Sequence, residues 1–194
     1  NMKLIQKFLM IVMVMLAWSS ITISAKGDKV DDNHLSCDGP YVIYLPDGGV
    51  RVVSVTVAGE VKDTTYASLP DNFTLHVTDH EGNYPFDVRL HPVVRQEWKQ
   101  SQAKKTFVMS DPHGRLNLVI SLLQANGVID SQLRWSYGDN QLVVIGDIFD
   151  RGYDVPQIFW LFYKLEAEAA ECGGRVSVML GNHEPMELAG DMRY

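Results

Sequence analysis

The sequence predicts an α/β protein with a layered core in residues 101–194, preceded by a small antiparallel β unit. After Lys105, short apolar strand candidates alternate with helix candidates, a rhythm typical of a layered α/β core. Before about residue 100, β-like segments alternate with turn sequences instead. The composition, 46% hydrophobic and 21% charged over 194 residues, is that of a globular chain. It excludes a disordered, collagen-like or disulfide-dense protein.

Residues 1–25 have the three-part pattern of a secretory signal peptide. Lys3 and Lys7 supply positive charge, residues 8–18 carry no polar side chain, and residues 19–25 are smaller and more polar. This order of segments is typical of a signal for export. The apolar run is short for a membrane span, which needs about 20 residues. We therefore predict a periplasmic or secreted protein with no stable membrane insertion after cleavage; an uncleaved N-terminal anchor is the alternative.

Net charge and cysteine content narrow the class of protein further. The formal net charge is −7, which argues against binding to a nucleic-acid backbone or an anionic membrane surface. Two cysteines, Cys37 and Cys172, are too few for a disulfide scaffold or a cysteine zinc cluster. After export they could form a single bridge, and the sequence leaves open whether they pair or stay free.

Residues 26–37 predict a flexible leader, and residues 38–100 a small β-rich unit that ends in a linker. Turn sequences at 46–49 and 79–83 separate the expected strands, as in antiparallel hairpins. The expected strands are residues 41–45, 50–57, 73–77 and 84–90. Residues 97–105 are polar and basic and predict a linker or the start of a helix. His76, His80 and His91 also fall in this unit, and we expect exposed structural roles for them rather than a metal site.

Residues 101–194 supply the predicted layered core. We expect strands at 106–110, 142–145 and 175–180 and helices at 116–125 and 155–171. Gly127 follows the first helix, and Gly173 with Gly174 follows the second. Glycine after an apolar periodic segment is a helix-end signal.

Each of the three strands in this core is followed by a cluster of polar side chains. The clusters are Asp111-Pro112-His113-Gly114, Gly146-Asp147-Ile148-Phe149-Asp150-Arg151-Gly152 and Gly181-Asn182-His183-Glu184. α/β proteins place their sites outside the carboxyl ends of sheet strands. Any one of these motifs could be a turn or a helix cap. Three of them, each after an apolar strand, are hard to explain as turn chemistry.

The residue types in these motifs fit a hydrolase with two metal ions. Two divalent ions about 3.5–4 Å apart need a carboxylate that bridges them, and Asp147 is the candidate. Asp111 and His113 can reach one ion, while Asn182 offers a neutral oxygen to the other. Water between the ions loses its proton easily and becomes the nucleophile.

Four further residues in the motifs have candidate roles beside the metals. Arg151 can hold phosphate oxygens with its planar guanidinium. His183 beside Asp150 can protonate a leaving oxygen. Glu184 is not an expected ligand, and its position predicts a role in fixing the loop after His183.

The three motifs resemble those of the calcineurin-like metallophosphoesterases. The Asp-Arg-Gly and Gly-Asn-His-Glu forms resemble the phosphoprotein phosphatase branch, and residues 155–194 are similar to the Shewanella-like bacterial protein phosphatases. The resemblance covers about residues 106–194. It implies the N-terminal half of an α/β/β/α sandwich. It also implies hydrolysis of phosphate monoesters by a metal-bound hydroxide without a phospho-enzyme.

The resemblance also implies individual roles. Asp111 and His113 resemble ligands of the first metal, Asp147 the bridge, Asn182 a ligand of the second metal, His183 with Asp150 the acid pair, and Arg151 a phosphate clamp. The cofactors implied are two divalent ions: manganese, iron or zinc. The family has two further histidines well after Gly-Asn-His-Glu, whereas this sequence ends eleven residues after His183. For these 194 residues alone we expect a damaged second metal site and little activity.

The predicted function is therefore metal-dependent phosphomonoester hydrolysis. The expected substrate is a protein phosphorylated on Ser/Thr or Tyr, or a small phosphomonoester. A symmetrical dinucleoside-tetraphosphate hydrolase, or another small-molecule phosphoesterase, is the second hypothesis. A third hypothesis is a non-catalytic fragment or binding module in which the β unit carries the function.

Overall fold

The computed structural model describes residues 37–191 and Arg193, all within one compact unit that spans Asp32–Tyr194. The predicted signal peptide and the leader up to residue 36 lie outside the described residues. Among the described residues, no helix is both long enough and apolar enough to span a bilayer.

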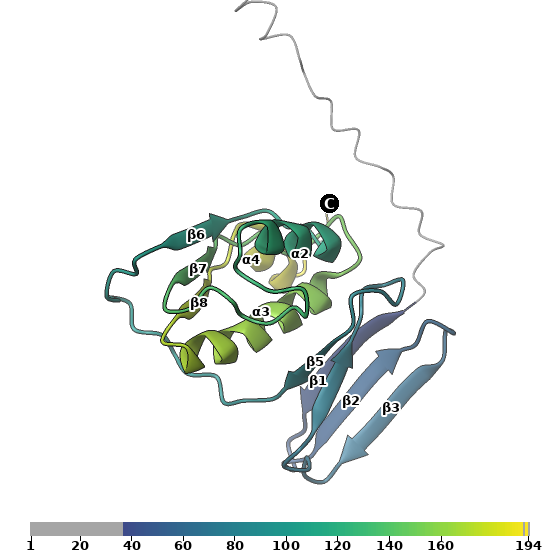
Figure 1. The fold of residues 1–194 in the computed structure, drawn as a ribbon. Coiled ribbons are helices and arrows are strands. Elements are labelled where there is room, and N and C mark those ends of the chain that lie inside the picture. Colours follow the sequence, from purple (N-terminus) through teal and green to yellow (C-terminus); the bar gives the residue numbers. More distant parts are fainter. Residues whose placement is uncertain (1–36, 192, 194) are drawn as a thin grey trace, which may run out of the picture. The chain divides into compact units, whose positions relative to one another are not determined.

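An antiparallel three-stranded sheet opens the described chain. Its strands, β1 (Asp38–Tyr44), β2 (Val50–Val55) and β3 (Val61–Tyr66), lie in that order (Figure 1). We did not predict β3, because its segment Val-Lys-Asp-Thr-Thr-Tyr is mostly polar and exposed and lacks an apolar alternation. Pairing with β2 along its whole length forms the strand, and Arg51 Nε donates to Asp63 Oδ1 at 2.8 Å across that pair.

A second antiparallel pair, β4 (Thr74–Val77) with β5 (Phe86–Arg89), follows in the chain. Alternate residues of the two strands are buried, which is the period of two that a half-buried sheet requires. The buried members are Leu75, Val77, Phe86 and Val88. They belong to the same hydrophobic cluster as the α/β part of the chain, so this hairpin shares its core.

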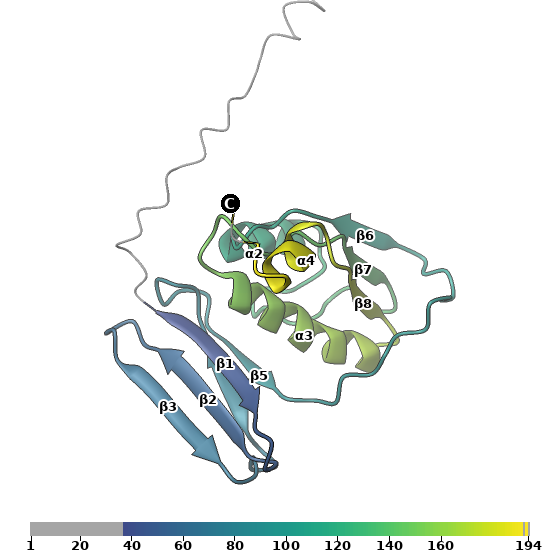
Figure 2. The same cartoon turned by 180° about the vertical axis from the view of Figure 1, so that it is seen from behind.

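The α/β part contains a parallel sheet of β6 (Thr106–Met109), β7 (Gln141–Val144) and β8 (Arg175–Val178), in that order (Figures 1 and 2). Helices α2 (Leu116–Ala125) and α3 (Val155–Glu171) have the predicted bounds. The buried residues of α2 are Leu116, Val119, Ile120 and Leu123, at the spacing of an apolar helix face. Residues 91–105 form a linker without a helix.

The short helix α4 (His183–Leu188) begins inside the third motif. We did not predict it, because six residues carry too little apolar periodicity to mark a helix. Its first residues, His183 and Glu184, are buried. The β unit and α3 are also joined by polar contacts: Gln157 Nε2 donates to the Gly39 carbonyl at 3.0 Å, and Trp160 Nε1 donates to the Pro40 carbonyl at 2.8 Å.

Both cysteines are free in the structure. Cys37 is buried, and Cys172 is exposed at the end of α3. Cys37 Sγ donates to the Asp79 carbonyl at 2.9 Å. Burial raises the pKa of the Cys37 thiol, and a hydrogen bond with Thr78 offsets part of this effect.

Candidate functional site

The three motif loops meet at the carboxyl ends of β6, β7 and β8. Main-chain hydrogen bonds join the first loop to the second: Asp111 N to Gly146 O at 3.1 Å, His113 N to Asp147 O at 3.0 Å, and Gly114 N to Ile148 O at 2.9 Å. The third loop joins them where His183 N donates to Asp147 Oδ1 at 3.0 Å. Segments separated by more than 30 residues of sequence thus form one site.

The glycines of the motifs allow this close approach. A Cβ on Gly146 would lie 1.9 Å from the nitrogen of Gly181, and a Cβ on Gly114 would lie 2.6 Å from the carbonyl carbon of Gly152. Both glycines also have a positive φ, +72° and +64°, where a side chain is strained. Only glycine lets these backbones touch without displacing one another.

Backbone strain is concentrated in the first two motifs. Among the described residues other than glycine, those with positive φ include Asp111, His113, Asp147, Asp150 and Arg151. Each such conformation costs about 1–3 kcal/mol and persists only where the surrounding structure imposes it. Strain of this kind clusters at functional sites, and here it coincides with five of the seven residues that the sequence singles out.

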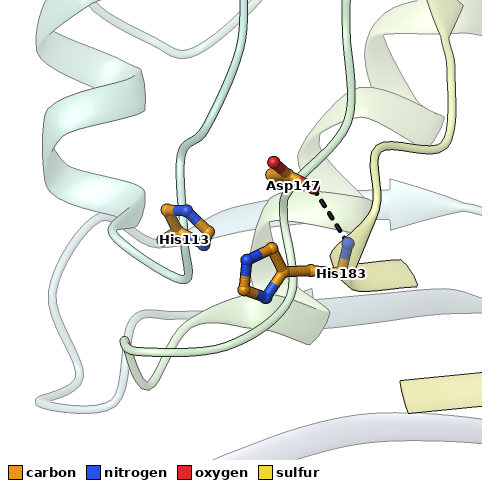
Figure 3. A group of neighbouring side chains, drawn as sticks. All are labelled: His113, Asp147 and His183. Atoms are coloured by element: carbon orange, nitrogen blue, oxygen red, sulfur yellow. Dashed lines mark hydrogen bonds between the residues drawn. The ribbon is translucent and has the colours of Figure 1, made fainter. Parts of the chain in front are cut away.

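His113, Asp147 and His183 form a group that could hold a metal ion. Each offers one ligand atom, and these atoms lie within 4.8 Å of one another (Figure 3). His113 is buried, and its Nδ1 lies 2.9 Å from the carbonyl oxygen of Phe149. Because a carbonyl only accepts, Nδ1 carries the hydrogen and Nε2 keeps a lone pair for a ligand.

Asp111 lies beside this group, and Asn182 adjoins it in the sequence. Asp111 Oδ1 is 3.8 Å from His113 Nε2, within the roughly 3–4 Å that separates two atoms bound at about 2.1 Å to one ion. Asn182 directly precedes His183 and is exposed, with its Nδ2 4.0 Å from Met186 Sδ. Carboxylate, imidazole and amide donors are the set that suits a divalent transition metal, so these residues fit such an ion.

The structure also brings together the predicted acid pair. His183 Nδ1 is 3.5 Å from Asp150 Oδ2, and both side chains are largely buried. Asp150 Oδ2 makes no hydrogen bond among the described residues, although it is shielded from solvent. A buried carboxylate oxygen without a donor is costly. Its direction toward His183 fits a bond that shortens when the site is loaded, as catalytic hydrogen bonds often do.

Arg151 lies at the open side of the same loop. Its side chain is 55% exposed, and its Nε is 3.7 Å from Asp150 Oδ2. Its backbone N donates to Asp150 Oδ1 at 2.7 Å. The backbone of Arg151 is thus held by Asp150, while its guanidinium is accessible to an oxyanion from solvent.

Glu184 joins the second and third motif loops through hydrogen bonds to their backbone. Its side chain is buried, and its carboxylate accepts backbone N–H groups of Asp147, Ile148, Phe149 and Gly181 at 2.9, 2.6, 3.2 and 2.6 Å. Burial by itself raises the pKa of Glu184, but the four N–H donors outweigh it and bring the pKa below its usual value. The sequence predicts a loop-fixing role for Glu184 but not that it reaches the second motif.

Comparison with known proteins agrees with this geometry. Residues 104–194 match the model of the calcineurin-like phosphoesterase family. The chain is 37% identical to Shewanella-like protein phosphatase 2 of Arabidopsis thaliana over 91 residues, which are 47% of this chain and 23% of that protein. It is 36% identical to Shewanella-like protein phosphatase 1 of Plasmodium berghei over 91 residues, or 46% and 25%.

Solved structures extend the likeness beyond this region. A cold-active protein-tyrosine phosphatase of a psychrophilic Shewanella species superposes with a TM-score of 0.68 and 33% identity, covering 81% of this chain and 46% of that one. Because 81% of the chain exceeds residues 104–194, the likeness includes part of the β unit. The α/β class and the preceding antiparallel sheet are confirmed. The chain spans about a quarter of the curated relatives and about half of the solved one.

Proposed function

We propose that this chain carries the metal-binding and phosphate-binding residues of a metal-dependent phosphomonoesterase of the protein phosphatase type. The observation that carries the proposal is the convergence of three motif loops on His113, Asp147 and His183, with Asp150 and Arg151 beside them. The similarity to Shewanella-like protein phosphatases and to a protein-tyrosine phosphatase supports a phosphorylated protein as the substrate. A small phosphomonoester contains the same reacting group.

Each side chain of the site has a proposed role that suits its chemical type. Asp111, His113, Asp147 and Asn182 would hold two divalent ions of manganese, iron or zinc. Such ions, when bound, polarise the phosphoryl group and make water acidic enough to attack at neutral pH. Arg151 would bind the non-bridging oxygens of the phosphoryl group. His183, with Nδ1 oriented by Asp150, would give a proton from Nε2 to the leaving oxygen.

The proposed organisation places this chemistry in an exported protein. Residues 1–25 would direct export and be removed, residues 38–100 would form a β-rich unit with its linker, and residues 101–194 would be the first half of the phosphoesterase domain. The periplasm or the extracellular space is the proposed location. N-terminal sequencing of the protein recovered from the periplasm or medium tests this, and a retained residue 2 contradicts cleavage.

Removal of metal tests the proposed function. The full-length protein is expected to release phosphate from an aryl phosphate, to lose this activity after treatment with a chelator and to regain it with Mn²⁺. The metal content of the same samples, measured by mass spectrometry, should fall and recover in parallel. Hydrolysis that continues after the metal has been removed would contradict the proposal.

Replacing Asp150 separates the acid pair from the metals. Asp150→Asn is expected to lower kcat roughly 100-fold, the scale of general acid catalysis, on an alkyl phosphate with a poor leaving group. The effect should shrink with p-nitrophenyl phosphate, because nitrophenolate leaves without a proton. Asp71→Asn, an exposed carboxylate of the β unit, is the control. An equal loss on both substrates would argue that Asp150 does not act through a proton on the leaving group.

A further inference from the structure

The loop between β4 and β5 is built to hold one histidine in place. Asp79, which is buried, accepts the backbone N–H groups of Glu81 and Asn83 at 3.1 and 2.6 Å. Its own N–H donates to Asn83 O at 2.9 Å, and its carbonyl accepts from Cys37 Sγ. These bonds fix the backbone on both sides of His80, which therefore leaves the loop in a defined direction.

His80 reaches from this loop to the residue before α3. Its backbone N and its ring Nδ1 lie 2.8 and 2.9 Å from the same oxygen, Oδ1 of Asp154. Asp154 is 3% exposed, and because its carboxylate accepts, both nitrogens donate. We expected an exposed role for His80, but its side chain is only 21% exposed. The alternation of the flanking strands does not show which side chains of their loop turn inward.

Asp154 departs from the usual behaviour of an aspartate in its position. It is the N-cap residue of α3, where aspartate commonly accepts an N–H of the first helical turn. Here its side chain makes no capping bond and instead binds a residue 74 positions away in sequence. Because Asp154 binds His80 instead of capping its own helix, we infer that another part of the fold requires this contact.

That constraint leads to the candidate site. Asp154 N donates to Gly114 O at 2.9 Å, in the first motif. The ring of His80 also contacts Tyr153, with centroids 4.8 Å apart. Tyr153 and Asp154 follow Gly152 in the chain, so His80 contacts the C-terminal end of this segment. Within the same segment, Asp150 and Arg151 have strained φ angles of +74° and +70°.

We propose that His80 is a positioning residue for the Asp150–Asp154 segment and that the β unit, through it, sets how well Arg151 binds substrate phosphate. This inference rests on the proposed function. Strained backbone needs support on both sides to persist. Bonds from the first motif to Asp147 and Ile148 hold the chain just before the segment, and the contacts of His80 with Tyr153 and Asp154 hold its other end.

The test compares matched histidine variants in the full-length protein. In His80→Ala, the KM for an aryl phosphate and the inhibition constant of inorganic phosphate should rise together about five-fold, with kcat within about two-fold, because ground-state binding is what weakens. His80→Asn keeps an N–H donor near the place of Nδ1 and should recover most of the affinity. The control is His76→Ala, which removes an exposed pair of the same length (His76 Nδ1 to Asp87 Oδ1, 2.9 Å) and should change neither constant.

The outcomes separate this inference from the proposed function. A thermal midpoint that falls in His80→Ala while KM and the inhibition constant stay unchanged would assign His80 a structural role only and overturn the inference alone. If His80→Ala does not fold, His80→Leu replaces it, because leucine fills the space of the ring but has no N–H donor: both constants should rise in His80→Leu and stay near wild type in His80→Asn, and wild-type constants in both variants would overturn the inference. A wild-type protein without hydrolysis would overturn both.

Discussion

Asp147→Asn is expected to lower kcat/KM for an aryl phosphate on the order of 1,000-fold, or about 4 kcal/mol of transition-state stabilisation. Asn keeps an oxygen at the position of Asp147 Oδ1, so the bond from His183 N, 3.0 Å long in the structure, can persist. The substitution removes the negative charge and one anionic oxygen. As the proposed ligand of both cations, Asp147 would offset part of their positive charge, and the site would lose that contribution.

Because the substitution removes the charge but keeps the hydrogen bond, metal binding and stability can be measured separately. The metal content after gel filtration should fall in Asp147→Asn, while the free energy of unfolding of the metal-free protein should stay close to wild type. Asp71→Asn, at an exposed carboxylate, should change neither quantity. Full activity in Asp147→Asn would remove the assigned mechanism, whereas a large loss of stability would mean that the variant reports folding rather than catalysis.

The regular elements of the α/β part could be predicted because their sequence pattern is local. Helix α3 shows why: its buried residues Ile158, Leu161, Phe162, Leu165 and Ala169 recur at helical spacing, and Gly173 closes it with a φ of +72°. Strand β3 shows the limit. Its residues are polar, and its existence depends on β2 beside it, a contact that no short window of sequence contains.

The sequence predicts which residues form the candidate site, but not the long-range contacts that support them. Asp147 and His183 can be found because polar residues after apolar strands are unusual and because strand ends meet at one sheet edge. The contacts of Asp154 with His80 and of Glu184 with the second loop connect residues 74 and 35–37 positions apart. Such contacts depend on how loops fold back. An acidic residue beside a motif indicates that an N–H donor lies close to it, but not which residue supplies that donor.

Glu184→Gln is expected to cost about 2–6 kcal/mol of unfolding free energy. The two carboxylate oxygens each accept two backbone N–H groups: Oε1 those of Ile148 and Phe149, Oε2 those of Asp147 and Gly181. In glutamine one oxygen becomes an NH₂ group, so two N–H donors face another donor. A buried donor left unsatisfied costs about 1–3 kcal/mol, and domains are stable by only about 5–15 kcal/mol.

Urea denaturation of the metal-free protein measures this loss, and Glu187→Gln on the same helix is the matched control, with an expected change within about 0.5 kcal/mol. Metal affinity should also fall in Glu184→Gln, because either pair of N–H groups that it can release, that of Ile148 and Phe149 or that of Asp147 and Gly181, includes the second motif loop. Partners that orient a ligand typically change affinity 10–100-fold. A Glu184→Gln protein as stable as Glu187→Gln would show that the loops hold their strained backbone without this carboxylate, through the other hydrogen bonds between them and the close contacts of their glycines.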